Sequence, residues 1–115
     1  MKITRLAADF SVSDQLQPED LPRVREAGYR ALVNNRPDSE EEGQPTAAQL
    51  RAEAHKLGLP YFYIPIVPGQ IRDEDAIALK DAATAAAGPV LAFCRTGARS
   101  TSLWKRSVEL AGSSE

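Results

Sequence analysis

Short apolar runs alternate along this chain with longer amphipathic segments, and turn residues separate the two kinds of segment. We expect the apolar runs to be strands and the amphipathic segments to be helices. Strands and helices that alternate in this way are typical of an α/β domain with a central, mainly parallel sheet and helices on both sides. Residues 1–115 are expected to form one such domain, because a chain of this length buries one hydrophobic core.

The expected strands differ in how much of their surface is apolar. They comprise residues 3–6, 10–13, 29–34, 61–67 and 89–93. The last of them reads Pro-Val-Leu-Ala-Phe and is apolar on both faces. This pattern is typical of a parallel strand that is covered by helices on both sides. We therefore expect residues 89–93 to form a central strand.

The amphipathic segments begin at typical helix signals. Thr46 and Gln49 form a capping-box pattern in front of one of them. Pro18 with two acidic residues begins an earlier helix, and the acidic residues 73–75 begin a later, alanine-rich one. The last helix is expected to begin at residues 98–100 and to turn four side chains toward the core, namely Leu103, Trp104, Val108 and Ala111.

Composition excludes several classes of function. The chain has one cysteine and one histidine, so it has no internal disulfide and too few ligands for a structural zinc cluster, and we expect no metal. Lys and Arg number 14 against 16 Asp and Glu, which is unlike the basic surface of a nucleic-acid-binding protein. No segment is apolar enough for a secretory signal or a membrane span. We expect a cytoplasmic protein with neither nucleic acid nor membrane as partner.

The single cysteine lies at the junction of the expected central strand and the last helix. This junction reads Cys94-Arg95-Thr96-Gly97-Ala98-Arg99-Ser100. Parallel α/β sheets bind ligands at the carboxyl ends of their strands, where this loop would lie. Gly97 permits a positive φ, so successive amides of the loop can point inward and bind an anion. Such surroundings lower the pKa of a cysteine, and Cys94 is therefore the candidate nucleophile.

Cys94 and the two arginines also have purely structural interpretations. A lone cysteine at a strand end is commonly a small buried hydrophobe, and Arg95 can be a solvated surface charge. Arg99 is less easily explained in this way, because an arginine in the first turn of a helix opposes the helix dipole. An anion bound in the loop would offset that cost. We therefore expect Cys94 and Arg99 to be catalytic and Arg95 to attract an anionic substrate.

Polar residues after another strand should reach the same edge of the sheet. The opposite wall of the crevice is expected to be formed by Asn34, Asn35, Arg36 and Asp38. The acidic stretch 39–43 that follows is either a solvated loop or a lid over the crevice. A reaction that releases a basic oxygen leaving group would also need a general acid, for which the candidates are Asp38, Asp73 and Asp75. Asp38 can instead be a turn residue, and the other two can be first-turn helix charges.

These segments resemble a known family, the phosphatase-like domain of β-lactamase hydrolase-like proteins. The order and spacing of several segments carry the resemblance, which extends from Ser13 and Gln15 to Trp104: Asn34 to Asp38, Glu42 to Pro45, Ile64 to Ile66 and Cys94 to Ser100. It implies a protein-tyrosine-phosphatase-like fold, alone or fused to a persulfide dioxygenase of the metallo-β-lactamase type, which makes such a dioxygenase a candidate partner. It also implies an activity described both as phosphatase-like and as rhodanese-like.

The loop length bears on the choice between these activities. Tyrosine phosphatases have a Cys-x5-Arg loop that surrounds a phosphoryl group, whereas Cys94 and Arg99 form a Cys-x4-Arg loop that resembles rhodanese. Phe93 and Tyr63 stand where tyrosine phosphatases and the family, respectively, often have histidine. We expect a sulfurtransferase in which Cys94, without a cofactor, accepts sulfur from a small anionic donor and passes it to a thiol or cyanide. The alternatives are hydrolysis of a phosphate ester through a phosphocysteine and a non-catalytic module that binds an anion or a persulfide.

Overall fold

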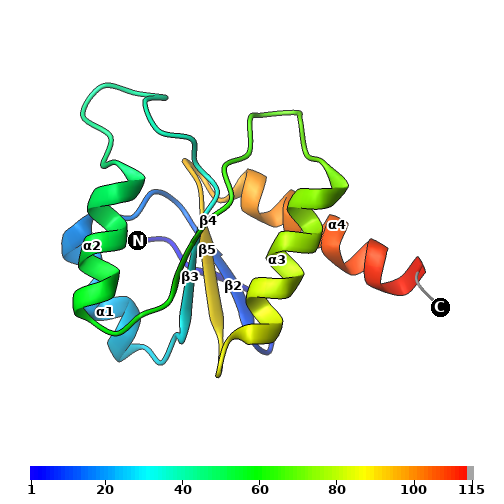
Figure 1. The fold of residues 1–115 in the computed structure, drawn as a ribbon, viewed down its shortest axis with the longest axis horizontal. Coiled ribbons are helices and arrows are strands. Elements are labelled where there is room, and N and C mark those ends of the chain that lie inside the picture. The colour runs from blue at the N-terminus through cyan, green and yellow to red at the C-terminus, as the bar shows by residue number, and fades with distance from the viewer. Residues whose placement is uncertain (114–115) are drawn as a thin grey trace.

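The computed structural model describes residues 1–113, which form a five-stranded sheet with helices on both of its faces (Figure 1). The strands are β1 (Thr4–Ala7), β2 (Phe10–Ser13), β3 (Ala31–Asn34), β4 (Tyr61–Tyr63) and β5 (Val90–Phe93). The helices are α1 (Leu21–Glu26), α2 (Ala47–Lys56), α3 (Asp73–Ala85) and α4 (Ala98–Ser113), and a 3-10 turn, η1 (Pro18–Asp20), precedes α1.

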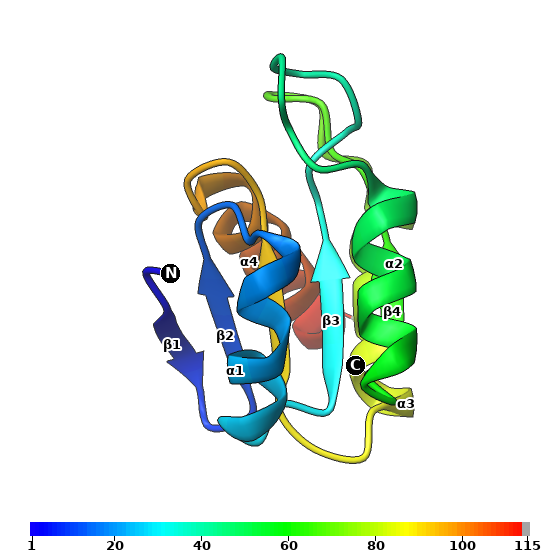
Figure 2. The same cartoon turned by 90° about the vertical axis from the view of Figure 1, so that its left-hand side faces the viewer.

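The sheet is mainly parallel, with β5 at its centre. The strand order is β1-β2-β5-β3-β4. β5 pairs in parallel with β2 and β3, and β3 pairs in parallel with β4, whereas β1 is an antiparallel edge strand. Figure 2 shows β2 and β3 pointing to the same edge of the sheet, above which the loop between β3 and α2 rises. The predicted α/β fold and the predicted central position of Val90–Phe93 are confirmed.

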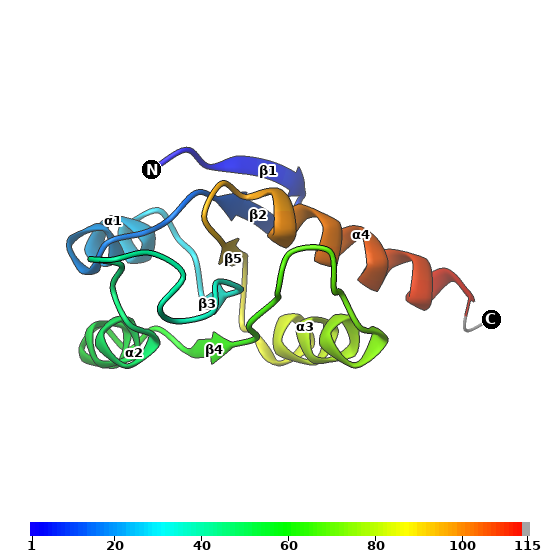
Figure 3. The same ribbon diagram turned by 90° about the horizontal axis from the view of Figure 1, so that it is seen from above.

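Two apolar clusters hold the helices against opposite faces of the sheet. Leu79 of α3 and Leu103 of α4 are buried on one face, and Leu21 of α1 and Leu50 of α2 are buried on the other. Side chains of β5 alternate between the two clusters, as the period of a strand requires. Each fully buried leucine stabilises the fold by about 1.5–3 kcal/mol. Seen from above, the helices lie in pairs on the two sides of the sheet (Figure 3).

Prolines shorten two of the expected elements. An α-helix does not begin at Pro18, because Pro22 has no N–H to donate to its carbonyl, and the 3-10 turn η1 forms there instead. The strand expected over residues 61–67 ends at Tyr63, since Pro65 also lacks an N–H. Residues 64 and 66 still donate hydrogen bonds to Asn34 and Asn35, each at 2.9 Å between N and O. The chain therefore continues along the loop after β3.

Helix α4 begins at Ala98, as predicted, but its second half is less buried than expected. Leu103 is fully buried and Trp104 is half-buried, whereas Val108 is 50% exposed. The prediction that Val108 faces the core is therefore wrong. Figures 1 and 3 give the reason, because the last turns of α4 extend beyond the sheet. No helix in the described part of the chain is long and apolar enough to cross a membrane.

Candidate active site

The loop from Cys94 to Arg99 is held at the carboxyl end of the sheet by backbone hydrogen bonds to the end of β2. The Cys94 amide donates to the Ser13 carbonyl at 3.4 Å, and the Arg95 carbonyl accepts from the Gln15 amide at 3.2 Å. Gly97 has a φ of +96°, a conformation that glycine adopts at little cost. A Cβ at this position would also lie 3.4 Å from the Ser13 carbonyl oxygen. The loop conformation therefore depends on Gly97.

The Cys94 thiol is fully buried and lies among backbone N–H groups of its own loop. The amide of Gly97 donates a hydrogen bond to Sγ at 3.0 Å. Burial raises the pKa of the thiol, but the backbone N–H groups of Ser100, Thr96, Gly97 and Arg99 together outweigh that effect and bring the pKa of Cys94 below its ordinary value. The surroundings that favour a thiolate are therefore present, and they consist mainly of peptide dipoles at the start of α4.

Arg99 faces both the thiol and an acidic residue from another loop. Its Nη1 donates to Oε2 of Glu40 at 2.7 Å, and its Nη2 donates to Oε1 at 2.9 Å, so the pair is bidentate. Nη1 also donates to the Ile66 carbonyl at 3.0 Å. Glu40 raises the pKa of Arg99 most strongly, and the Cys94 thiol also contributes. Arg99 is thus fixed between Glu40 and the thiol.

Arg36 joins the same cluster from the other side of Glu40. Its Nε donates to Oε1 of Glu40 at 2.9 Å, and its Nη1 donates to the side-chain oxygen of Gln15 at 3.0 Å. Its Nη2 pairs with Glu41 at 3.3 Å. Arg36 is only 3% exposed, so this cationic side chain is buried with its charge compensated. The cluster links the end of β2, the loop after β3 and the start of α4.

Asn34 and Asn35 connect the loops around Cys94 to one another. The Asn34 side chain donates to the Tyr61 hydroxyl at 2.8 Å and accepts from the Arg36 amide at 2.9 Å. The Asn35 side chain donates to the Ile64 carbonyl at 2.9 Å and accepts from the Ser100 hydroxyl at 2.8 Å. Both asparagines are buried, and their side chains hold the loops together.

The remaining residues of the Cys94 loop lie at its surface. Arg95, Thr96 and Ala98 are exposed. The Thr96 hydroxyl accepts a hydrogen bond from the Ala98 amide at 3.3 Å, which supports the first turn of α4. The exposure of Arg95 is compatible with the prediction that it attracts an anionic substrate, which stays a prediction.

The candidate general acids are engaged in structural contacts. Asp38 accepts a hydrogen bond from the Ala47 amide at 2.7 Å, at the start of α2. Asp73 pairs with Arg106 at 2.7 Å, and Asp75 pairs with Arg72 at 3.0 Å while capping α3. The interpretation of these residues as turn and first-turn charges therefore accounts for the contacts they make.

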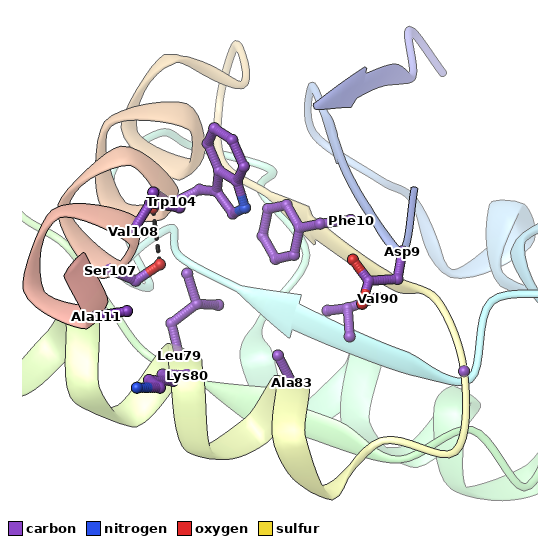
Figure 4. Close-up of a pocket in the computed structure, with 11 residues that line it drawn as sticks. Asp9, Phe10, Leu79, Lys80, Ala83, Val90, Trp104, Ser107, Val108 and Ala111 are labelled. Atoms are coloured by element: carbon purple, nitrogen blue, oxygen red, sulfur yellow. Dashed lines mark hydrogen bonds between the residues drawn. The ribbon is translucent and has the colours of Figure 1, made fainter. Parts of the chain in front are cut away.

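An apolar pocket lies at the opposite end of β5 and is separate from the Cys94 loop. Figure 4 shows it between α3 and α4, where Leu79 and Trp104 line it together with Phe10 of β2. The Phe10 and Trp104 rings stack with their centroids 6.1 Å apart. Two grooves border the Cys94 loop itself, one beside Gly97 and one beside Arg99. The cluster of Arg36, Glu40 and Arg99 thus lies at one end of the sheet, and this mainly apolar pocket, which Asp9 and Lys80 also line, lies at the other.

Sequence reasoning missed Glu40 as an individual residue. It lies in the acidic stretch 39–43, which the sequence allows to be interpreted either as a solvated loop or as a lid. Its position four residues after Arg36 does not indicate their ion pair, because this spacing brings side chains together on a helix and residues 36–40 form a loop. Its bidentate contact with Arg99 joins residues separated by 59 positions, and nothing in the local sequence indicates that pairing. The contact of Gln15 with Arg36 likewise joins distant residues, and no local pattern indicates it.

Comparison with known proteins identifies the family. Residues 2–111 match the model of the phosphatase-like domain of beta-lactamase hydrolase-like proteins. The chain belongs to this family. It is 33% identical over 104 residues to a beta-lactamase hydrolase-like protein of Agrobacterium fabrum, a match that covers 90% of this chain and 24% of the relative. The chain thus spans about a quarter of the length of the curated relatives it matches.

Solved structures of similar proteins are phosphatases by description. A putative phosphatase from Neisseria meningitidis is 34% identical, has a TM-score of 0.81, and is matched over 90% of this chain and 74% of its own. Tk-PTP, at 17% identity with a TM-score of 0.64, is matched over 83% of this chain and 61% of its own and shares the fold. The family membership and the tyrosine-phosphatase-like fold predicted from the resemblance are confirmed. The comparisons support a cysteine-based, phosphatase-like enzyme, and they do not bear out the first expectation of a sulfurtransferase.

Proposed function

We propose that this chain hydrolyses phosphate esters, with Cys94 as the nucleophile. The Sγ thiolate attacks phosphorus, the bond between phosphorus and the leaving oxygen breaks, and the electron pair of that bond leaves with the oxygen. Water then cleaves the sulfur–phosphorus bond of the phosphocysteine, which releases phosphate and restores the thiolate. Backbone N–H groups of the loop and the Arg99 guanidinium would stabilise the equatorial oxygens of the phosphoryl group.

The single observation that carries this proposal is the contact set of the thiol. The Gly97 amide donates to Sγ at 3.0 Å, and neighbouring amides together with Arg99 surround the same atom. A group attached to Sγ would therefore place its own oxygens among donors that already point to this position. Family membership and the phosphatase neighbours support the same chemistry.

The engaged acids define which esters would react fastest. Asp38 accepts a hydrogen bond from the Ala47 amide and Asp73 pairs with Arg106, so both carboxylates are already engaged by other groups. A leaving group of high pKa departs slowly without a proton donor, so esters with acidic leaving groups are favoured. We expect 4-nitrophenyl phosphate to be turned over much faster than phenyl phosphate.

The experiment compares the intact chain with the Cys94→Ser variant on 4-nitrophenyl phosphate. Wild type should release 4-nitrophenol, and the variant should lose at least about 1000-fold in kcat. A phosphorylated Cys94 should be trapped by rapid acid quenching and identified by mass spectrometry. Equal rates in the two proteins, at equal thermal stability, would refute the role of Cys94.

Sulfur transfer is a second candidate function, favoured by the Cys-x4-Arg spacing of Cys94 and Arg99. In this reaction the thiolate attacks the outer sulfur of thiosulfate, sulfite leaves with the electron pair of the sulfur–sulfur bond, and Cys94 becomes a persulfide. No proton donor is needed for that step. Incubation with thiosulfate followed by intact-mass measurement should then show one added sulfur on wild type and none on Cys94→Ser. If a sulfur adduct forms and no ester is hydrolysed, sulfur transfer becomes the function of the chain and phosphate hydrolysis is ruled out.

A further inference from the structure

The guanidinium of Arg99 already holds an anion, and that anion belongs to the chain itself. Both oxygens of Glu40 are bound by the two terminal nitrogens of Arg99, at 2.7 and 2.9 Å. This parallel arrangement is the one in which arginine also recognises phosphate. The side chains of Arg99 and Glu40 are 13% and 22% exposed, so solvent screens the pair only in part.

Glu40 is held as an ionised ligand by a second guanidinium. Arg36 donates to Oε1 of Glu40 at 2.9 Å, so one carboxylate oxygen is shared by two arginines. The pKa of Glu40 is lowered, chiefly by its hydrogen bond from Arg99, while burial opposes this shift and Arg36 adds to it. The side chain is therefore negatively charged at neutral pH, as a bound substrate would be.

The segment that carries Glu40 is anchored at its base and ion-paired at its tip. At the base, the Asp38 amide donates to the Tyr63 hydroxyl at 2.9 Å, and Gln44 donates to the Pro37 carbonyl at 2.9 Å. At the tip, Glu40 and Glu41 bind the arginines, and the side chain of Glu40 is 22% exposed against 58% for Glu41. The tip can therefore leave Arg99 by breaking the ion pairs of Glu40 and Glu41, with the base in place. Figure 2 shows that this loop between β3 and α2 rises above the edge of the sheet.

We propose that Glu40 is an internal ligand of the oxyanion site, which the anionic group of a substrate must displace from Arg99. Displacement favours ligands that can accept more hydrogen bonds at this site than the carboxylate of Glu40 accepts. A phosphoryl group can bind Arg99 and the loop amides around Cys94 together, whereas Glu40 binds arginines alone. Glu40 thus makes the site selective for tetrahedral oxyanions over simple carboxylates. The inference rests on the proposed function for the place of the substrate at Arg99.

The test is the affinity of the intact, reduced chain for inorganic phosphate, measured by calorimetry in a phosphate-free buffer of low ionic strength. Removing an internal competitor raises the fraction of protein that is ready to bind, so Glu40→Gln should bind phosphate about tenfold tighter than wild type. The matched control is Glu42→Gln, which removes the same charge from the same segment at an exposed position. Its affinity should stay within about twofold of wild type.

The opposite outcome has a definite meaning. If Glu40→Gln binds phosphate no more tightly than wild type, Glu40 positions Arg99 for the substrate and is not its competitor, and the proposal is wrong. Glu40→Asp guards against a folding defect, because it keeps the charge but shortens the reach to the guanidinium and should give an intermediate affinity. Phosphate binding requires no turnover. Tighter binding by Glu40→Gln in a chain that hydrolyses no ester would thus preserve this inference and remove the proposed function.

Discussion

Helix α4 carries two arginines that form ion pairs across the fold, and the two pairs differ in their surroundings. The N–O distance is 2.7 Å from Arg99 to Glu40 and also 2.7 Å from Arg106 to Asp73. The side chains are 13% and 22% exposed in the first pair, but 41% and 59% exposed in the second. Water and salt weaken the second pair far more than the first. The two ion pairs therefore have the same N–O distance, but Arg99–Glu40 is a partly buried contact at the candidate active site and Arg106–Asp73 is a surface contact.

The difference in exposure indicates that Arg99, and not Arg106, is positioned to bind a ligand. Arg99 lies in the first turn of α4, where the helix dipole disfavours a cation, and it is largely buried. A partly buried ion pair is a weak source of stability, because both charges lose solvation. Its position beside the Cys94 thiol explains its presence better than stability does. Arg106 lies further along the helix and needs no such explanation.

The largest expected effect separates the two arginines by activity. Arg99→Ala removes the side chain that would bind a phosphoryl oxygen, so kcat/KM for 4-nitrophenyl phosphate should fall about 100-fold. Arg99→Lys keeps the charge but loses the two-nitrogen fork, and it should recover only part of that loss. Arg106→Ala is the matched control, because it removes the same side chain from the same helix. Equal losses in Arg99→Ala and Arg106→Ala would show that the variants act through the stability of α4.

A smaller effect concerns the ionisation of Cys94. The amides at the start of α4 outweigh burial and lower the pKa of the thiol below its reference value of 9.0. The thiolate should therefore persist to a lower pH than in a free cysteine. Its contribution to stability is present above the pKa of the unfolded chain and is lost as pH falls through the lowered pKa of the folded chain.

The thiolate can be titrated by its absorbance at 240 nm, with Cys94→Ser as the blank. The single cysteine makes the signal unambiguous. The midpoint should lie below 9.0 in wild type and in Arg106→Ala. It should rise in Arg99→Ala, because a nearby cation is lost. A midpoint at or above that of the unfolded protein would contradict the account of the loop amides.

Local patterns in the sequence predict much of the fold. Thr46 and Gln49 form the capping box at the start of α2 as expected, because both partners lie within one helical turn. The central place of Val90–Phe93 follows from a strand that is apolar on both faces. The sequence predicts the Cys94 loop at the edge of the sheet because Cys94 directly follows a strand that is apolar on both faces, and it predicts the positive φ at Gly97 from the residue itself.

Features that depend on distant parts of the chain were not predicted. Val108 has the helical spacing of a core residue, but its exposure depends on how far the sheet extends beneath α4. The pairing of Glu40 with Arg99 depends on the path of the loop after β3, which the anchors at Asp38 and Tyr63 fix. Burial of Arg36 likewise needs acceptors from two loops. Such contacts depend on tertiary structure, so a local sequence pattern does not predict them.

The smallest expected effect concerns the surface ion pair between Arg106 and Asp73, and it tests whether this pair contributes little to the protein. Arg106→Ala breaks contacts with Asp73 and Glu109, all of them exposed side chains. Thermal stability should fall by no more than about 3 °C at low salt, and the difference from wild type should vanish in 1 M NaCl. The Glu40→Gln variant should retain its altered phosphate affinity relative to wild type at the same salt concentration, because its contact is partly buried. If 1 M NaCl removed both the stability change of Arg106→Ala and the affinity change of Glu40→Gln, the difference in exposure would not distinguish the two arginines. The burial of Arg99 could then not explain its role.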